Sequence, residues 1–305
     1  MINDYVLKLI GNLPDEIKNV QTPIIIDLVL DGGIFNGSYL VGALHFLKEM
    51  EKQKFITINR ISGCSVGSII AFLYYIDCLN LMPKFYEIIH TDFKQTYNLK
   101  MIKEFKTLLG ENIPSNICEK VNKKFYISYN NIKKRKKIIK NTYKDIDDLL
   151  NSIIKSCYIP FLIDGNMLYE NKFMDGINPF MFEKEPNHKI LYLDLFGYDK
   201  IGNLLNVKNE KSNFHRILSG LLDIHTFFIK QSNTQMCSYV NDWNLYNLVF
   251  YSMKLMIEKI LVYLTYFIIY IKDNFPDNYK NNIISKIVIK ITQDIFIILL
   301  ENYCL

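Results

Sequence analysis

Residues 63–67 read Gly-Cys-Ser-Val-Gly and form the pattern G-x-S-x-G, in which Ser65 stands between two glycines. An apolar stretch typical of a β-strand precedes the pattern and one typical of a helix follows it, as a nucleophile elbow requires. In such an elbow a sharp turn exposes the serine hydroxyl, and the start of the following helix favours developing negative charge. The context indicates that Ser65 is a nucleophile for acyl transfer, although a chance match in a turn would have the same letters.

A serine nucleophile also needs hydrogen-bond donors for the oxyanion, and the pair Gly32-Gly33 could supply them. The pair follows the apolar run 23–30 and precedes a helical pattern that begins near Ser38. Because glycine adopts backbone conformations that other residues avoid, such a turn can aim N–H groups at a bound oxygen. A plain strand-to-helix turn and a phosphate loop are the alternatives. Neither Gly-Lys-Ser/Thr nor G-x-G-x-x-G is present, which disfavours a nucleotide site.

Two Asp-Gly pairs and two histidines are candidates for the base that activates the serine. Asp175 lies in the sequence FMDGINPF, whereas Asp164 is followed by Gly165 and Asn166 and suits a tight turn. A Ser-Asp-His triad in the chain order of α/β-hydrolases would instead use His215 or His225.

Four stretches in this order, LDGGIFNGSYLVGALHFL, ISGCSVGSIIAFL, SCYIPF and FMDGINPF, resemble the motifs of patatin-like phospholipases, from about residue 24 to 197. Members of that family are acyl hydrolases of phospholipids and other lipid esters that use a Ser-Asp dyad and no histidine. The resemblance implies that Ser65 is the nucleophile and that Asp175, rather than Asp164, is the dyad aspartate. The residues it implies for the oxyanion loop are Gly32, Gly33, Ile34 and Gly37, and the other motif glycines are Gly63, Gly67 and Gly176.

The sequence departs from the family pattern at three positions. Ile34 stands where a third glycine is usual, Asn36 where Arg or Lys is usual, and Ile177 where a glycine commonly follows Asp-Gly. Altered loops are also what a non-catalytic relative would show. A weakened or inactive lipid-binding protein and a triad esterase therefore stay open as alternatives to a dyad hydrolase.

The elements that must position these residues alternate between strand and helix. The apolar run 23–30 predicts a strand buried on both faces, residues 56–62 are interpreted as the next strand, and 188–196 as another buried strand. Residues 38–52 have a helical apolar pattern. This alternation predicts an α/β fold, a mostly parallel sheet flanked by helices, with a helical C-terminal region. We expect an acyl hydrolase domain over residues 1–212 and a helical region over 213–305 packed on the same domain.

Several connections are also predicted. Residues 80–125 are expected to form a helical insertion or cap, and residues 125–140 a strand pair that turns at Asn130-Asn131. A helix should end near Pro160, and a second hairpin is expected at 164–166. Two apolar pieces at 245–271 and 283–304 are expected to be helical and to pack as core or cap.

Composition limits the function classes. Half of the 305 residues are apolar, and a net charge of +5 is too small to indicate nucleic-acid binding. None of the six cysteines lies in a C-x-x-C pattern, so we expect no metal and no cofactor. Heavy use of Ile, Lys, Asn and Tyr suggests an AT-rich genome, viral or microbial. The patterns do not specify an oligomeric state.

The expected partner is a lipid or phospholipid substrate. No apolar run reaches the length of a membrane span, and the N-terminus lacks a signal-peptide core, so an intracellular protein is expected, cytoplasmic or peripheral to a membrane. The basic run 133–137 and the aromatic residues of the C-terminal region could dock reversibly on an anionic surface. The alternative is a solvated hairpin tip and a packed C-terminal core.

Overall fold

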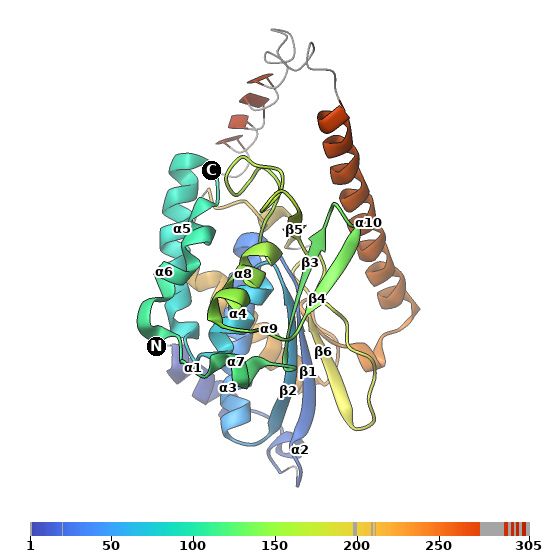
Figure 1. Cartoon of the computed structure of the whole chain (residues 1–305). Helices are drawn as coiled ribbons and strands as arrows, with labels where there is room; N and C mark the ends of the chain where they lie inside the picture. Colours follow the sequence, from blue (N-terminus) through green and yellow to red (C-terminus); the bar gives the residue numbers. More distant parts are fainter. Residues whose placement is uncertain are drawn as a thin grey trace.

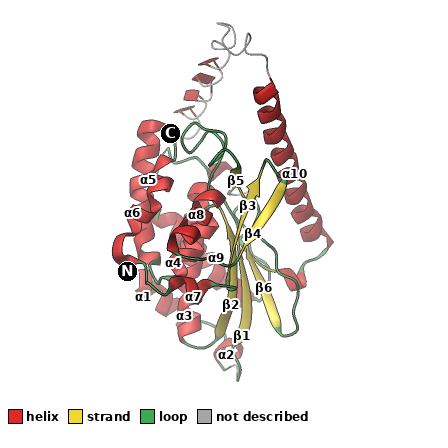
Figure 2. Cartoon of the chain, viewed as in Figure 1, coloured by secondary structure: helices red, strands yellow, loops and turns green. Residues whose placement is uncertain are grey.

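The computed structural model describes residues 2–19, 21–197, 200–208, 210 and 212–274, with the short pieces 290–291, 294–295, 297–298 and 301–302. Its centre is a seven-stranded sheet in the order β4-β3-β2-β1-β6-β7, with β5 paired to β3 (Figures 1 and 2). Four central strands run parallel: β1 (Ile24–Leu30), β2 (Ile56–Cys64), β3 (Phe125–Asn131) and β6 (His188–Leu193). The antiparallel strands are β4 (Lys136–Lys140), β5 (Phe173–Asp175) and β7 (Cys237–Tyr239). The predicted fold class is confirmed.

Helices flank this sheet, and the two that pack most closely are α3 and α9. A Cβ atom on Gly42 would lie 1.9 Å from the carbonyl oxygen of Ile217, so only glycine permits this approach of the two backbones. The α-helices are α1 (Ile2–Gly11), α2 (Asp15–Lys18), α3 (Gly37–Lys52), α4 (Val66–Tyr75), α5 (Met82–Thr96), α6 (Phe105–Leu109), α7 (Ile117–Val121), α8 (Ile146–Ser156), α9 (Phe214–Lys230) and α10 (Leu245–Asn274). The short 3-10 helices are η1 (Ile34–Asn36), η2 (Leu79–Leu81), η3 (Lys100–Glu104), η4 (Gly110–Asn112), η5 (Ile201–Asn203) and η6 (Val240–Asp242).

Strand β1 is buried on both faces. Leu28 and Leu30 belong to the main core with α3, α4 and α9, while Val29 packs on the other face with Phe182 and Tyr192. This double burial explains the continuous apolar run, because neither face of the strand meets water. The carboxyl ends of β1 and β2 carry the two glycine-containing turns, so the parallel sheet brings the two turns together.

Three predicted connections differ from the structure. Asn130 and Asn131 lie within β3, and the turn of the β3–β4 hairpin falls at 132–135. The second predicted hairpin is an irregular loop whose only strand-like pairing among the described residues is one bridge from Tyr169 to Phe173. Strand β7 interrupts the region that the apolar pattern predicted as helical, because a three-residue strand is too short to show a period.

Helix α10 lies along the edge of the molecule beside the β3–β4 hairpin (Figure 1). Its helical structure agrees with the prediction for 245–271, but most of its large apolar side chains are exposed, so the expected core packing holds only for its inward face. Within the described residues, no helix is long and apolar enough to cross a membrane. The predicted helix at 283–304 lies mostly outside the described residues.

Candidate active site

The elbow holds Ser65 in a strained conformation between β2 and α4. Its backbone has φ 49° and ψ −133°, a combination that non-glycine residues rarely adopt outside functional turns. The flanking glycines are required sterically, since a Cβ atom on Gly63 would lie 2.8 Å from the backbone of Gly67, and one on Gly67 would lie 2.5 Å from the Asp31 carbonyl oxygen. The elbow predicted from G-x-S-x-G is therefore present as a structure.

Two further serines support the elbow through hydrogen bonds. The N–H of Ser65 donates to Oγ of Ser156 at 2.9 Å, and that hydroxyl donates to the carbonyl oxygen of Ser128 at 2.7 Å. Ser156 comes from the end of α8 and Ser128 from β3. The backbone N–H of Ser65 is thus already bonded and does not face the substrate. The stretch SCYIPF contributes this support, a role that its sequence alone does not reveal.

Asp175 lies at the end of β5, and its side chain is buried. Its Oδ1 accepts the N–H of Ile177 at 2.6 Å, while Oδ2 has no hydrogen-bond partner among the described residues. Burial raises the pKa of Asp175 to about 6, and the nearby Ser65 hydroxyl counteracts part of that rise. Oδ2 is therefore available to accept a proton from a hydroxyl group.

More distant charges also act on Asp175. After burial, Ser65 and the Ile177 N–H, the carboxylate of Glu258 raises the pKa of Asp175 and the ammonium of Lys137 lowers it. Glu258 belongs to α10 and Lys137 to β4, so two elements outside the family motifs contribute to the electrostatic environment of this aspartate.

The glycine turn has a more specific arrangement than the sequence predicted. The N–H of Gly32 donates to its neighbour Asp31 Oδ1 at 3.0 Å, and the N–H of Phe35 donates to the Leu204 carbonyl oxygen at 3.2 Å. The N–H groups of Gly33 and Ile34 donate to no acceptor in the described part of the chain. Among the described residues, these two N–H groups of the turn are therefore free to bind a ligand oxygen. Gly32 instead provides space, because a Cβ atom there would lie 3.1 Å from Cβ of Ser65.

Gly37 also acts through its small size. It begins α3 beside the elbow helix, and a Cβ atom on it would lie 2.3 Å from Cγ2 of Val66. A Cβ atom on Gly176, which follows Asp175, would lie 2.2 Å from the Ser128 carbonyl oxygen. Both positions therefore require glycine so that the three site segments can approach one another.

Two isoleucines occupy glycine-like backbone positions. Ile34 has φ +46° and Ile177 has φ +60°, values that are strained for a β-branched residue. These are two of the three positions at which the sequence departs from the patatin pattern. The departures change the side chains while the backbone keeps the left-handed conformation that a glycine would adopt without strain.

The third departure, Asn36, is accompanied by a buried cation from another element. Nη1 of Arg216, on α9, donates to Oδ1 of Asn36 at 2.7 Å, and its guanidinium is also held by Glu210. The side-chain amide of Asn36 donates to the carbonyl oxygen of Lys200 at 2.9 Å. Where the family pattern has a basic side chain in the loop itself, this chain brings a guanidinium to the loop from about 180 residues further on.

An apolar pocket opens beside Ser65, between the elbow and the segment that contains α5, η3 and α6. This segment was predicted as a helical cap, and its inward side chains form the far wall. The pocket suits a hydrocarbon chain, because few of the groups that line it can hydrogen-bond. The side chains that line it include Phe35, Ile69, Met82, Phe85, Tyr86, Leu99, Phe105 and Ile159.

The candidate histidines do not join this site. His215 is largely exposed and its Nε2 lies 3.3 Å from Glu210, and His225 packs its ring against Phe46. Neither lines the pocket at Ser65. Asp164 is also elsewhere, since its carboxylate binds Lys103 and the hydroxyl of Tyr158. Of the candidate bases, Asp175 is the one that the fold brings to the serine.

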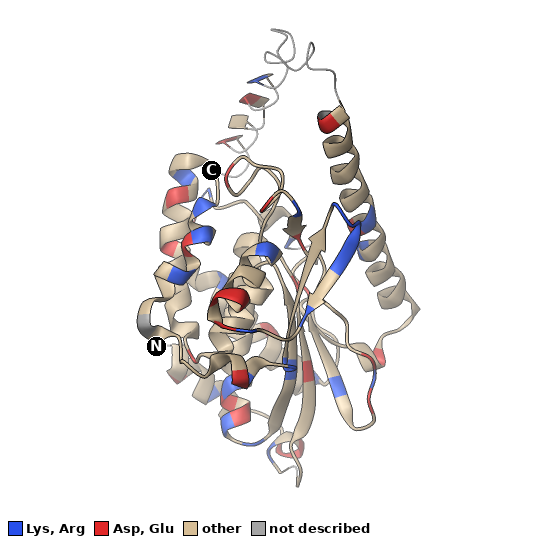
Figure 3. Ribbon diagram, in the orientation of Figure 1, with Lys and Arg blue, Asp and Glu red and all other residues tan. Residues whose placement is uncertain are grey.

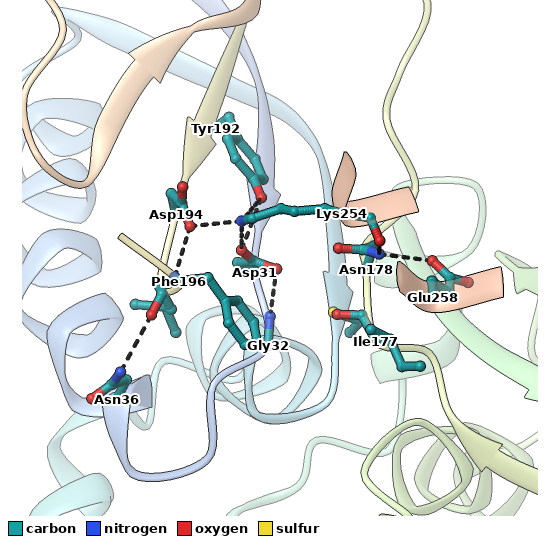
Figure 4. A network of polar contacts seen from close by, with 12 residues as sticks. Asp31, Gly32, Asn36, Ile177, Asn178, Tyr192, Asp194, Phe196, Lys254 and Glu258 are labelled. Carbon is teal, nitrogen blue, oxygen red and sulfur yellow. Dashed lines mark hydrogen bonds and ion pairs between the residues drawn. The ribbon is translucent and has the colours of Figure 1, made fainter. Parts of the chain in front are cut away.

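A network that sequence reasoning missed lies behind the glycine turn (Figure 4). Nζ of Lys254, on α10, is 2.8 Å from Oδ2 of Asp31 and 2.7 Å from Oδ1 of Asp194, and the hydroxyl of Tyr192 donates to the same Asp31 oxygen. One turn later, Oε2 of Glu258 accepts the side-chain amide of Asn178 at 2.9 Å. Charged residues in an apolar helix were the available signal, but their partners could not be assigned without the fold.

Comparison of the sequence with known families identifies the class of the protein. The fold and the family together define the class, a lipid acyl hydrolase of the α/β type. The model of the patatin-like phospholipase family matches residues 28–228, about two thirds of the chain, and the protein therefore belongs to that family. A comparison with curated proteins finds no match. The matched segment includes Arg216 and all of α9 except its last two residues. Within the described residues, no group of three or more His, Cys, Asp or Glu side chains could hold a metal ion.

Proposed function

We propose that the protein is a serine acyl hydrolase that cleaves fatty acyl esters of glycerophospholipids or related lipids through a Ser65–Asp175 dyad. The observation that carries this proposal is the buried Asp175 carboxylate, whose Oδ2 lacks a partner while the Ser65 hydroxyl acts on its pKa. A pKa near 6 leaves the carboxylate ionised at neutral pH and basic enough to accept a proton in the transition state.

In the first half of the reaction, Oγ of Ser65 bonds to the ester carbonyl carbon while its proton passes to Oδ2 of Asp175. The negative charge on the carbonyl oxygen is stabilised by the N–H groups of Gly33 and Ile34. When the tetrahedral intermediate collapses, the bond to the alcohol oxygen breaks. The leaving alcohol takes the proton from Asp175, and the acyl group remains on Ser65.

In the second half, water gives a proton to Asp175 and its oxygen bonds to the acyl carbon. The bond to Oγ of Ser65 then breaks, Ser65 recovers the proton, and a fatty acid leaves. The apolar pocket beside the elbow would hold the acyl chain throughout, which favours lipid esters over small polar ones.

The experiment that tests this function compares the wild type with Ser65→Ala by product analysis on phospholipid vesicles and by labelling with a fluorophosphonate. Fatty acid release and labelling should both disappear in Ser65→Ala, with little change in melting temperature. The exposed serine variant Ser115→Ala should behave as the wild type. Labelling that persists in Ser65→Ala would exclude Ser65 as the nucleophile. A wild type that binds vesicles without releasing fatty acid would favour the non-catalytic alternative.

A further inference from the structure

Helix α10 presents most of its large apolar side chains to solvent and several polar side chains to the protein, whereas a helix on the surface of a soluble domain faces its apolar side inward. On its inward side, Glu258, Val262 and Thr265 are buried. On the opposite side, apolar residues recur every three or four positions and form one continuous stripe, which we call the outer face. Six side chains of the outer face, each more than half exposed, are Met256, Ile260, Tyr263, Leu264, Phe267 and Tyr270.

The inward contacts fix this orientation. Lys254 binds Asp31 and Asp194, and Glu258 binds Asn178 at 2.9 Å and Nζ of Lys137 at 2.9 Å. Turning the helix to bury the outer face would leave these charges unpaired inside the protein, which is more costly than exposing apolar surface. The exposure of the outer face is therefore a built-in property of the folded chain.

The neighbouring surface is positively charged. The tip of the β3–β4 hairpin carries exposed Lys133, Lys134 and Lys136, and Figure 3 shows this hairpin coloured for basic residues beside α10. The guanidinium of Arg135 lies 4.6 Å from the ring centroid of Tyr266 on α10. The cationic tip thus contacts the helix directly. An apolar helical stripe with aromatic residues beside a cluster of cations matches the acyl boundary and the anionic headgroups of a bilayer.

We propose that the outer face of α10 and the hairpin tip dock the protein on an anionic lipid bilayer, with α10 lying in the interface. The proposal rests on the proposed function for its biological purpose, since a lipid ester substrate resides in such a bilayer. A second copy of the chain is the competing occupant, but it would have to bring the like-charged hairpin tips close to an apolar interface, which charge repulsion opposes.

Docking would also bear on the catalytic loops. Lys254 holds Asp31, whose other carboxylate oxygen holds the Gly32 N–H, and Glu258 holds Asn178, three residues after the dyad aspartate. One helix therefore supports both the oxyanion turn and the Asp175 loop. Lys254 and Glu258 are positioning residues in this scheme, and a bilayer that immobilises α10 also immobilises their partners.

The test is co-sedimentation of the full chain with phosphatidylcholine vesicles and with vesicles that also contain phosphatidylglycerol. In the outer-face variant, Ile260→Ser, Leu264→Ser and Phe267→Ser are combined. The matched control combines Leu222→Ser and Ile229→Ser, two exposed apolar residues of α9. We expect the outer-face variant to bind anionic vesicles at least about tenfold more weakly, because each lost apolar side chain removes buried area, and the control to bind as the wild type.

A hairpin variant with Lys133→Gln, Lys134→Gln and Lys136→Gln separates the electrostatic contribution. Its binding should fall on anionic vesicles at low salt and change little on neutral ones. Hydrolysis of a soluble short-chain ester, measured on all variants, should be unchanged in the outer-face variant. If the wild type lacks that activity, the proposed function fails while the sedimentation result still decides docking.

Three results would overturn the docking proposal. In the first, the wild type stays in the supernatant with both kinds of vesicle. In the second, the outer-face variant sediments with vesicles as strongly as the wild type. In the third, the wild type is a dimer that binds no vesicles, and the outer-face variant is a monomer. The last result would assign the outer face to a second copy of the chain.

Discussion

Nζ of Lys254 lies 2.8 Å from Oδ2 of Asp31, although 223 residues separate them in the chain. The other carboxylate oxygen of Asp31 accepts the Gly32 N–H, so the ion pair connects α10 to the turn beside Ser65. Burial raises the pKa of Asp31 to about 6, and the charge of Lys254 counteracts that rise. The turn at Gly32 and Gly33 is thus linked to a residue outside the segment that matches the family.

Replacing Lys254 should weaken the turn more than the fold. In Lys254→Met, the buried carboxylate of Asp31 and the partly exposed carboxylate of Asp194 lose their cation, and breaking a buried pair typically costs about 3–5 kcal/mol near neutral pH. We expect kcat on a soluble ester to fall at least about tenfold with little change in KM, because the apolar pocket is untouched. The double variant Lys254→Met with Asp31→Asn should recover stability but not kcat. Unfolding by urea and steady-state kinetics measure both, with Lys134→Met as the exposed control, and unchanged kcat in Lys254→Met would exclude the positioning role.

The activity should depend on the ionisation of Asp175. As a proton acceptor it must be ionised, and its pKa is raised to about 6, chiefly by burial. We therefore expect kcat/KM to be constant above about pH 7 and to fall roughly tenfold for each pH unit below 6. Because the pKa of Asp31 is also raised to about 6, the same profile should be recorded for Asp31→Asn. A midpoint that moves in Asp31→Asn would assign the titration to that residue instead.

The two Asp-Gly aspartates should have opposite effects on stability. The folded pKa of Asp175 lies above its unfolded value near 3.8, so the ionised group opposes folding by roughly 3 kcal/mol above pH 6, and stability falls as pH rises between these values. Asp175→Asn should therefore raise the melting temperature at pH 8 and abolish activity.

Asp164 provides the matched contrast. Burial alone would raise the pKa of Asp164, but hydrogen bonds from Lys103 and Tyr158 lower this pKa to about 2. Its ionised form adds stability that is present above the unfolded pKa and is lost as pH falls toward 2. Asp164→Asn should lower the melting temperature at pH 8 while most activity remains. Melting curves of Asp175→Asn and Asp164→Asn are measured at pH 8 and pH 4. If both substitutions shift the melting temperature at pH 8 in the same direction, the prediction is contradicted.

Gly33 should tolerate no side chain. Its φ is +154°, and a Cβ atom would lie 2.9 Å from Cβ of Leu195, so Gly33→Ala must shift the turn that presents the two available N–H groups. Loss of one oxyanion donor typically lowers turnover by about 10² to 10³-fold. We expect a loss of that size in kcat for Gly33→Ala, and none for Gly11→Ala, where a Cβ atom would meet nothing within 4 Å. Normal turnover in Gly33→Ala would leave the turn with a structural role alone.

The strain at Ile34 can be measured by comparing two truncations. Ile34→Ala and Ile34→Gly both remove the side chain from the pocket, but only glycine relaxes the backbone at φ +46°. We expect the glycine variant to be more stable than the alanine variant by about 1 kcal/mol, the reverse of the usual order. Turnover should also rise in Ile34→Gly, where the loop regains the glycine of the family pattern. Urea unfolding decides the first point, and equal or reversed stabilities would refute strain at this position.

Much of the site could be predicted because the local sequence determines the local backbone conformation. G-x-S-x-G between a strand and a helix allows few structures other than an elbow. The glycines at 63, 67 and 176 lie where backbones approach too closely for a side chain, and those at 32, 33 and 37 lie against neighbouring side chains. The β-branched run of β1 likewise indicated a strand buried on both faces, and the alternation of strands and helices indicated a parallel sheet. Predictions failed where the pattern was short or degenerate, as at the hairpin turn and at the three-residue β7.

By itself, the sequence determined the α/β fold class, the elbow at Ser65 and the choice of a patatin-like loop, since each depends on residues close together in the chain. The tertiary structure alone decided which charges meet across long separations: Lys254 with Asp31, Glu258 with Asn178, and Arg216 with Asn36. It also decided the orientation of α10, because a helix with apolar residues on most of its surface has no single predicted inward face. The buried ion pairs fix that face, since an unpaired charge inside the protein costs more free energy than an apolar side chain in water.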